Sequence, residues 1–267
     1  MKNILVTGAS GQIGSELTPE LRNENGINTV VASDIEDSDN LDEPFEIVDV
    51  LNKNNLNEIV ERYDIDTIFH LASILSAKGE ENPNLAYQVN INGLYNVLEV
   101  TKEKNLEKLI VPSSIAVFGP ETPDVPTEKT ITNPNTIYGI SKVFLELMAS
   151  YYDEKFDLDI RGVRFPGLLS YKTKPGGGTT DYAVEVFYQA LKERKYEYFV
   201  RKDTRLPMMY MPDAIKALIQ LSKAEKSNLR YHCDYNVNSM CFRADELTEE
   251  IKKHIPNLND IEMHDKE

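Results

Sequence analysis

A tyrosine and a lysine four residues apart, Tyr138 and Lys142, form the pair best suited to acid–base chemistry. On a helix, residues at positions i and i+4 share one face, so the phenol and the ammonium would lie close together. A phenol with a pKa near ~10 is a poor base at neutral pH, but a nearby positive charge favours phenolate. The spacing therefore predicts a general base that removes a proton from a hydroxyl group.

Two consecutive serines, Ser113 and Ser114, follow an apolar run that we expect to form a strand at 108–113. Ligands bind at the carboxyl ends of strands in open α/β sheets. A hydroxyl at this position can hold the reacting oxygen of a substrate, whereas the alternative is that the serines only cap the strand. We favour Ser114 as the reacting hydroxyl, and the sequence leaves Ser113 open.

Three glycines with the spacing Gly-x-x-Gly-x-x-Gly lie between an expected strand at 3–7 and an expected helix at 12–24. Glycine allows a tight turn and a close approach of the backbone to a pyrophosphate, and a helix N-terminus offers free N–H groups. The run predicts a dinucleotide site, and the alternative is an ordinary turn. The predicted site residues in this loop are Gly8, Gly11, Gln12, Ile13 and Gly14.

Two aspartates follow the next expected strands. Asp34 comes 20 residues after Gly14, where a carboxylate binds the adenosine ribose hydroxyls and repels a 2′-phosphate. No arginine lies beside Asp34, so we expect NAD rather than NADP. Asp49 and Val50 follow the third strand, where a carboxylate can meet the adenine amino group. For both aspartates the alternative is a simple turn residue.

The elements that position these residues alternate between apolar strands and helical segments through residue 165, which indicates βαβ units. Strands are expected at 3–7, 29–33, 45–48, 66–72, 108–113 and 159–165, and helices at 12–24, 53–62, 84–104 and 135–155. The predicted fold class is α/β, with a Rossmann-type, doubly wound parallel sheet. We assign 1–165 to a dinucleotide-binding domain that includes the serine, tyrosine and lysine.

The chain becomes irregular after Pro166 and Gly167, and 174–178 is expected to be a flexible loop. Further helices are expected at 181–194, 212–224 and 244–254, and further strands at 196–200, 235–237 and 260–263. We assign 166–267 to a smaller α/β lobe that completes the substrate site.

Composition excludes several classes of protein. The chain has 29 basic and 44 acidic residues, a net charge of −15, which argues against nucleic acid and anionic membranes as partners. No apolar run approaches the ~18 residues of a membrane span. Two cysteines, Cys233 and Cys241, favour a reducing cytoplasm over a disulfide scaffold, with a single bridge as the alternative. His232, His254 and His264 are too scattered to predict a metal site.

The motifs together resemble the extended short-chain dehydrogenases. The matching residues are Gly8, Gly11, Gly14, Asp34, Asp49, His70, Leu71, Ala72, Asn90, Ser114, Val117, Phe118, Gly119, Tyr138, Lys142, Arg164, Pro166 and Gly167. The resemblance implies that NAD is the cofactor. It also implies that its site includes His70, Leu71, Ala72, Asn90 and Pro166, with His70 as a wall residue.

Four segments, 74–80, 117–123, 178–183 and 206–214, are similar to the short-chain-type L-threonine 3-dehydrogenases. This resemblance implies oxidation of the threonine side-chain alcohol to 2-amino-3-oxobutanoate. Tyr138 would take the hydroxyl proton, Lys142 would bind the nicotinamide ribose and lower the pKa of Tyr138, and Ser114 would hold the alcohol oxygen. The implied substrate contacts are Ser76, Ser113, Ser114, Tyr138, Gly178, Thr179 and Thr180.

Two other functions remain open at this point. A nucleotide-sugar epimerase or dehydratase of the same superfamily needs basic contacts for a diphosphate, and the chain offers Lys172, Lys174, Arg201, Lys202 and Arg205. A non-catalytic NAD-binding regulator would bind the cofactor without turnover.

Two expectations concern assembly and length. The helix at 135–155 is apolar on several faces, so we expect a homodimer joined through 84–104 and 135–155. The resembling family continues beyond the segment similar to 255–256, so we expect the smaller lobe to be truncated and its pocket to be more open.

Overall fold

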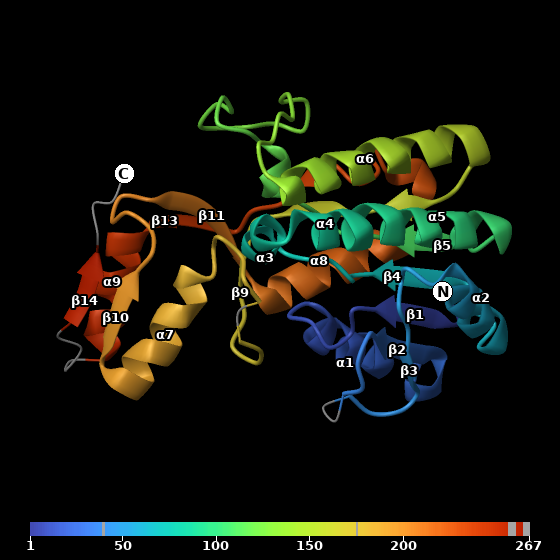
Figure 1. Ribbon diagram of the computed structural model, residues 1–267, viewed down its shortest axis with the longest axis horizontal. Coiled ribbons are helices and arrows are strands. Elements are labelled where there is room, and N and C mark those ends of the chain that lie inside the picture. The colour runs from blue at the N-terminus through green and yellow to red at the C-terminus, as the bar shows by residue number, and fades with distance from the viewer. Residues whose placement is uncertain (39–40, 175, 256–259, 264–267) are drawn as a thin grey trace.

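The computed structural model describes residues 1–38, 41–174 and 176–255 and the backbone of 260–263. A parallel six-stranded sheet lies at the centre of its larger part (Figure 1). Its order is β3-β2-β1-β4-β5-β7. These strands are β1 (Ile4–Thr7), β2 (Val30–Asp34), β3 (Phe45–Ile47), β4 (Thr67–His70), β5 (Lys108–Ile110) and β7 (Ile160–Arg161). The order turns back between β1 and β4, so the predicted doubly wound sheet is confirmed.

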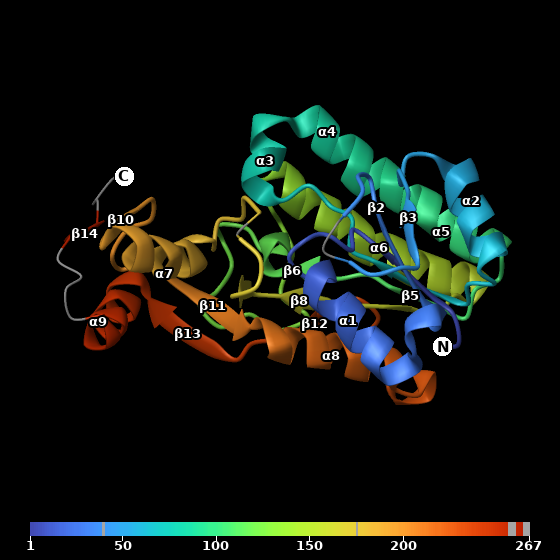
Figure 2. The same ribbon diagram turned by 90° about the horizontal axis from the view of Figure 1, so that it is seen from below.

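Helices cover both faces of this sheet, because alternate side chains of buried strands point to opposite sides (Figure 2). On one face Leu5 and Ile68 pack against the helices α2, α5 and α6. On the other face Val6 and Phe69 pack against α1 and α8. The bounds are α1 (Gly14–Asn25), α2 (Lys53–Arg62), α5 (Leu94–Glu103), α6 (Ile137–Phe156) and α8 (Met211–Lys223).

Two expected strands are each divided in two. The segment 159–165 forms β7 and then β8 (Val163–Phe165), with Gly162 between them. The segment 108–113 ends as β5 at Ile110, and β6 (Ser113–Ser114) follows. A Cβ at Gly162 would collide with the carbonyl oxygen of Val111, so these two segments of the backbone lie very close together there. Beyond this point, β6 and β8 join β12 (Tyr235–Asn236) in a separate sheet of order β12-β8-β6.

The helix expected at 84–104 is interrupted. It consists of α4 (Pro83–Tyr87), a π-helical turn (Gln88–Gly93) and α5. A short helix that was not expected, α3 (Ser76–Glu81), precedes it and begins directly at the predicted substrate residue Ser76.

The smaller lobe packs around a cluster that includes Tyr182, Tyr198 and Met208. It contains β9 (Gly167–Leu169), α7 (Tyr182–Glu193), β10 (Lys195–Tyr198), β11 (Arg205–Tyr210), β13 (Met240–Arg243), α9 (Ala244–His254) and β14 (Asp260–Met263). The strands β9, β11 and β13 were not expected, whereas the helices and β10 lie where the sequence predicts them. Because α8 and β12 return to the larger part, the boundary at residue 165 stays a prediction.

Other expectations can be checked within the described ranges only. There, no helix has the length and hydropathy to cross a bilayer, and no three His, Cys, Asp or Glu side chains gather as metal ligands. Cys233 is buried and Cys241 is exposed, and both are free thiols. His264 and Pro175 lie outside the described residues.

Candidate active site

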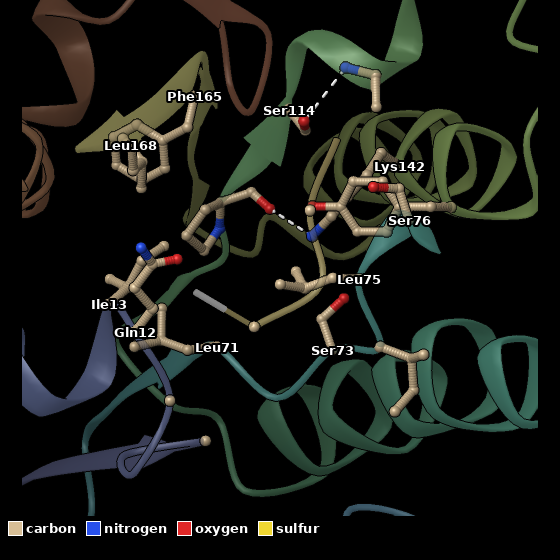
Figure 3. Close-up of a pocket in the computed structure, with 18 of the residues that line it drawn as sticks. Gln12, Ile13, Leu71, Ser73, Leu75, Ser76, Ser114, Lys142, Phe165 and Leu168 are labelled. Atoms are coloured by element: carbon tan, nitrogen blue, oxygen red, sulfur yellow. Dashed lines mark hydrogen bonds between the residues drawn. The ribbon is translucent and has the colours of Figure 1, made fainter. Parts of the chain in front are cut away.

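A cavity of about 580 Å³ opens at the carboxyl ends of the parallel strands, beside the smaller lobe. Figure 3 shows Gln12, Ile13 and Leu71 on one side of it and Ser114 and Lys142 on the other. The predicted site residues that line this cavity are Gly8, Gly11, Gln12, Ile13, Gly14, His70, Leu71, Ala72, Ser76, Asn90, Ser113, Ser114, Tyr138, Lys142, Pro166, Gly178, Thr179 and Thr180. Segments far apart in the sequence therefore meet at one place, as the motifs predict.

The glycine loop packs directly against the chain that follows β4. Gly8 has a φ of +71°, and a Cβ there would lie 2.6 Å from the Ala72 nitrogen. A Cβ at Gly14 would lie 2.6 Å from the Ala9 Cα. Any side chain at either position would push the loop off its neighbours, so both glycines are required by the local geometry.

Unpartnered polar atoms in this loop fit a bound dinucleotide. The Ser10 hydroxyl and the Gln12 side-chain nitrogen are buried and have no hydrogen-bond partner among the described residues. The loop also ends at the N-terminus of α1, where free N–H groups attract phosphate. Asp34 accepts a hydrogen bond from the Ser10 nitrogen at 2.9 Å, which ties the loop to the end of β2.

Three predicted cofactor residues do not line this cavity. Asp34 lies at the end of β2, and its second oxygen accepts from the Ile35 nitrogen at 2.8 Å. Asp49 accepts from the Leu51 nitrogen at 2.9 Å in the turn before α2, and Val50 is buried. Their contacts with the adenosine half of the cofactor stay predictions.

Tyr138 lies at the start of α6, and it lines the cavity together with Ser114, whose hydroxyl accepts from the Ala116 nitrogen at 3.2 Å. Burial raises the pKa of Tyr138 to about 12, and interaction with the Ser114 side chain opposes this rise. The Lys142 Nζ lies 5.5 Å from the centre of the Tyr138 ring and donates to the Pro112 carbonyl at 2.8 Å. Burial lowers the pKa of Lys142 to about 8. In the protein alone burial therefore dominates the Tyr138 pKa, and the lowering expected from Lys142 together with oxidised nicotinamide stays a prediction.

The two serines point in different directions. Ser113 donates to Glu146 Oε1 at 2.6 Å, and the same carboxylate binds Arg164 through contacts of 2.8 and 2.7 Å. The Ser113 hydroxyl donates its hydrogen to Glu146, and both serines line the cavity. Successive residues of a strand point to opposite faces, which favours Ser114 over Ser113 as the reacting hydroxyl, and both roles stay predictions.

His70 ends β4 as a buried, neutral wall residue. Its Nδ1 lies 2.8 Å from the Thr7 hydroxyl. Burial lowers the pKa of His70 to about 3, and the charge of Lys142 lowers it further. Because the ring is uncharged at neutral pH, the geometry agrees with the wall role that the resemblance implies.

Asn90 lies in the π-helical turn with all its hydrogen-bonding capacity used. Its oxygen accepts from the Ile74 nitrogen at 2.7 Å and the Ser73 hydroxyl at 3.2 Å. Its nitrogen donates to the Ile74 carbonyl at 2.9 Å and to Ser141 at 3.3 Å. The amide therefore shapes the chain after β4, and because Asn90 also lines the cavity, its contact with the cofactor stays a prediction.

The predicted substrate residues on α3 and before α7 are joined to each other. The Thr179 nitrogen donates to the Ser76 hydroxyl at 3.3 Å, and the Ala77 nitrogen donates to the Gly177 carbonyl at 3.0 Å. These bonds hold two segments about 100 residues apart against one another.

Two residues that sequence reasoning missed belong to this region. Asp181 accepts from the Gly177 and Gly178 nitrogens at 2.8 and 2.7 Å, and it lines the cavity. An aspartate directly before a helix is a signal that could have identified it. Lys78 also lines the cavity, and no sequence signal distinguished it from other surface lysines.

Comparison with known proteins identifies the family of this chain. The sequence profile of the NAD-dependent epimerase/dehydratase family matches residues 4–237, and the chain belongs to this family. A relative from Staphylococcus haemolyticus, an uncharacterized epimerase/dehydratase, is 45% identical over 263 residues, which are 97% of this chain and 82% of the relative.

Two solved structures are also similar. An L-threonine dehydrogenase from Clostridium difficile matches with a TM-score of 0.93 and 47% identity, over 99% of this chain and 85% of its own. A monomeric L-threonine 3-dehydrogenase from a metagenome matches with a TM-score of 0.94 and 46% identity, over 98% and 85%. The fold, the glycine loop and the family together define an NAD(H)-binding enzyme of the short-chain dehydrogenase type.

Proposed function

We propose that this protein is an NAD-dependent L-threonine 3-dehydrogenase, which oxidises the side-chain alcohol of threonine to 2-amino-3-oxobutanoate. The observation that carries the proposal is that Ser114, Tyr138 and Lys142 line one cavity together with Ser76 and Thr179. Two similar structures have this activity in their names. The small polar lining suits a small zwitterion.

The chain's own residues manage the proton of the reaction. NAD, when bound, supplies the acceptor for the hydride that leaves the threonine β-carbon. Ser114 holds the alcohol oxygen, and Tyr138 in its phenolate form takes the hydroxyl proton. The high pKa of Tyr138 in the protein alone means that phenolate becomes available only when positive charge enters the site. Lys142, which we expect to hold the nicotinamide ribose, contributes part of that charge.

The preference for NAD over NADP rests on Asp34. Both of its oxygens accept backbone hydrogen bonds at the end of β2, so the carboxylate is fixed in place. A 2′-phosphate brought beside it would meet like charge. We expect Asp34→Asn to reduce the preference for NAD, measured as the ratio of kcat/KM with NAD to kcat/KM with NADP. Equal activity of the wild type with NAD and NADP would contradict the role assigned to Asp34.

A nucleotide-sugar epimerase or dehydratase is less well supported. Of the five basic residues considered for a diphosphate, only Lys174 lines the cavity. Lys172 lies 3.7 Å from Glu16, and Arg201 pairs with Asp203 at 3.0 Å. A non-catalytic regulator would not need Ser114, Tyr138 and Lys142 together in one cavity.

The tests are NADH formation, followed by its absorbance, and product analysis by chromatography, with threonine, serine, 3-hydroxybutyrate and a UDP-hexose as separate substrates. Threonine alone should give rapid turnover. Conversion of the UDP-hexose without threonine oxidation would favour the epimerase, and NAD binding without turnover on any substrate would favour the regulator.

We further propose a homodimer in the cytoplasm. Leu147 on α6 is 66% exposed, and Ile140, Tyr151 and Tyr95 on α6 and α5 are about half exposed, so this apolar face lacks cover in one chain. Both thiols are free, which suits a reducing compartment. Light scattering at micromolar concentration tests the dimer; a monomeric mass, as in the name of one similar structure, would refute it.

A further inference from the structure

The first turn of α1 is tied to the segment that leads from β9 into the substrate residues. Ser170 donates a hydrogen bond to Glu16 Oε1 at 2.9 Å. The hydroxyls of Ser15 and Thr173 are 2.8 Å apart, and the Lys172 Nζ lies 3.7 Å from Glu16 Oε2. Three polar contacts therefore join two consecutive residues of α1 to residues 170–173 of the smaller lobe.

Burial makes one of these contacts the most important. The Glu16 side chain is 4% exposed and Ser170 is 6% exposed, so their bond is shielded from water. Lys172 is 52% exposed, and an ion pair at such a position contributes little. A hydrogen bond to a buried carboxylate is stronger than one between neutral groups, so Glu16 and Ser170 form the principal link.

The two ends of this link belong to different binding sites. Glu16 lies in the helical turn that directly follows the glycine loop, and the Ser15 nitrogen bonds to the Gly11 carbonyl at 2.9 Å within that turn. Residues 170–173 precede Gly177 and Thr179, which form hydrogen bonds with α3 on the opposite side of the cavity. The connection between β9 and α7 is thus attached to α1 near its start and to α3 near its end.

We propose that Glu16 and Ser170 are positioning residues that couple the dinucleotide site to the substrate site. Phosphate bound at the N-terminus of α1 holds its first turn in place. Through Glu16 and Ser170 the same turn holds residues 170–173, and Thr173 lines the cavity that Ser76 and Thr179 also line. Binding of either ligand then strengthens binding of the other by the same factor, since such coupling is reciprocal. The choice of threonine as the substrate in this inference rests on the proposed function.

Kinetics with four variants test the coupling. Glu16→Ala and Ser170→Ala each remove the link, whereas Glu16→Gln keeps an oxygen that accepts from Ser170. Glu20→Ala, one turn further along α1 and exposed, is the matched control. We expect the two link-breaking variants to raise the KM for threonine about tenfold, as for loss of a buried charged hydrogen bond. We expect kcat, and the dissociation constant of NAD measured without threonine, to stay within about twofold of wild type. Glu16→Gln should recover most of the loss, and Glu20→Ala should match wild type.

Hydrogen–deuterium exchange of the full chain gives a readout that does not need turnover. NAD should slow exchange in the peptide covering 166–173 of wild type and of Glu20→Ala, and not in Glu16→Ala. If wild type does not oxidise threonine, the proposed function fails while exchange still decides the coupling. Equal slowing in Glu16→Ala would overturn the inference. An NAD dissociation constant that rises in step with the threonine KM would also overturn it, because α1 itself would then be damaged.

Discussion

The two sides of the cavity are built in different ways. On the cofactor side, Gly8 and Gly14 let backbone pack on backbone at the end of a regular parallel sheet. On the substrate side, short segments from α3 and from the chain before α7 are joined by polar contacts such as Thr179 to Ser76. The first construction tolerates almost no added atom, whereas the second depends on individual hydroxyl and carboxylate groups. The two sides should therefore respond differently to substitution.

The largest expected effect separates chemistry from cofactor binding. Tyr138→Phe removes the proton acceptor and leaves the glycine loop intact, so kcat should fall by at least ~10²-fold. The NAD dissociation constant, measured by calorimetry, should stay near that of wild type. Near-normal turnover in this variant would contradict the mechanism.

The next effect tests the backbone construction of the cofactor side. Gly8→Ala combines a strained φ of +71° with a Cβ 2.6 Å from the Ala72 nitrogen, so the NAD dissociation constant should rise by at least about tenfold. Gly26→Ala is the control, because its φ is +100° but its Cβ would approach only Thr29, at 4.0 Å. Calorimetry should show unchanged NAD affinity for Gly26→Ala. If both variants lose NAD affinity equally, backbone strain causes the loss, and the contact with Ala72 after β4 does not.

A smaller effect compares neighbouring serines. Ser114→Ala removes the partner of Tyr138 and should lower kcat about tenfold, as expected for one hydrogen bond. Ser113→Ala removes a bond to Glu146, so kcat should change less than about threefold. Steady-state kinetics on both variants decide the matter. The reverse order of effects would reassign the reacting hydroxyl.

The smallest effect concerns stability in acid. The pKa of His70 is about 3 in the folded protein against 6.5 for a free side chain, so the unfolded chain binds an extra proton between these values. Stability from this group is present above pH 6.5 and is lost as the pH falls towards 3, by at most about 1.4 kcal/mol per pH unit. Urea unfolding of His70→Gln should show a shallower acid slope than wild type, and the exposed His254→Gln should not. Identical slopes would mean that His70 is solvated.

The same contrast explains how far the sequence could be interpreted. The strand β1 begins with three consecutive apolar residues, and α2 lies where its periodicity predicts. Strands β9 and β13 have only three and four residues, and β11 contains Pro207, which argues against a strand in sequence, so these three were not predicted. Lys142 was expected to lower the Tyr138 pKa because the sequence shows spacing but not burial. The bond from Ser113 to Glu146 could not be predicted from the sequence either.

The π-helical turn at Gln88–Gly93 has a consequence for insertions and deletions. A π turn accommodates one residue more than the α-helix around it. Deleting a single residue here would restore a regular helix, in which α4 and α5 could keep their orientation while the residues of the turn change the direction in which they point. Asn90 would then no longer face Ile74 and Ser141. The length of this segment is therefore constrained independently of its composition, and even a deletion that keeps every cavity residue should disturb the active site.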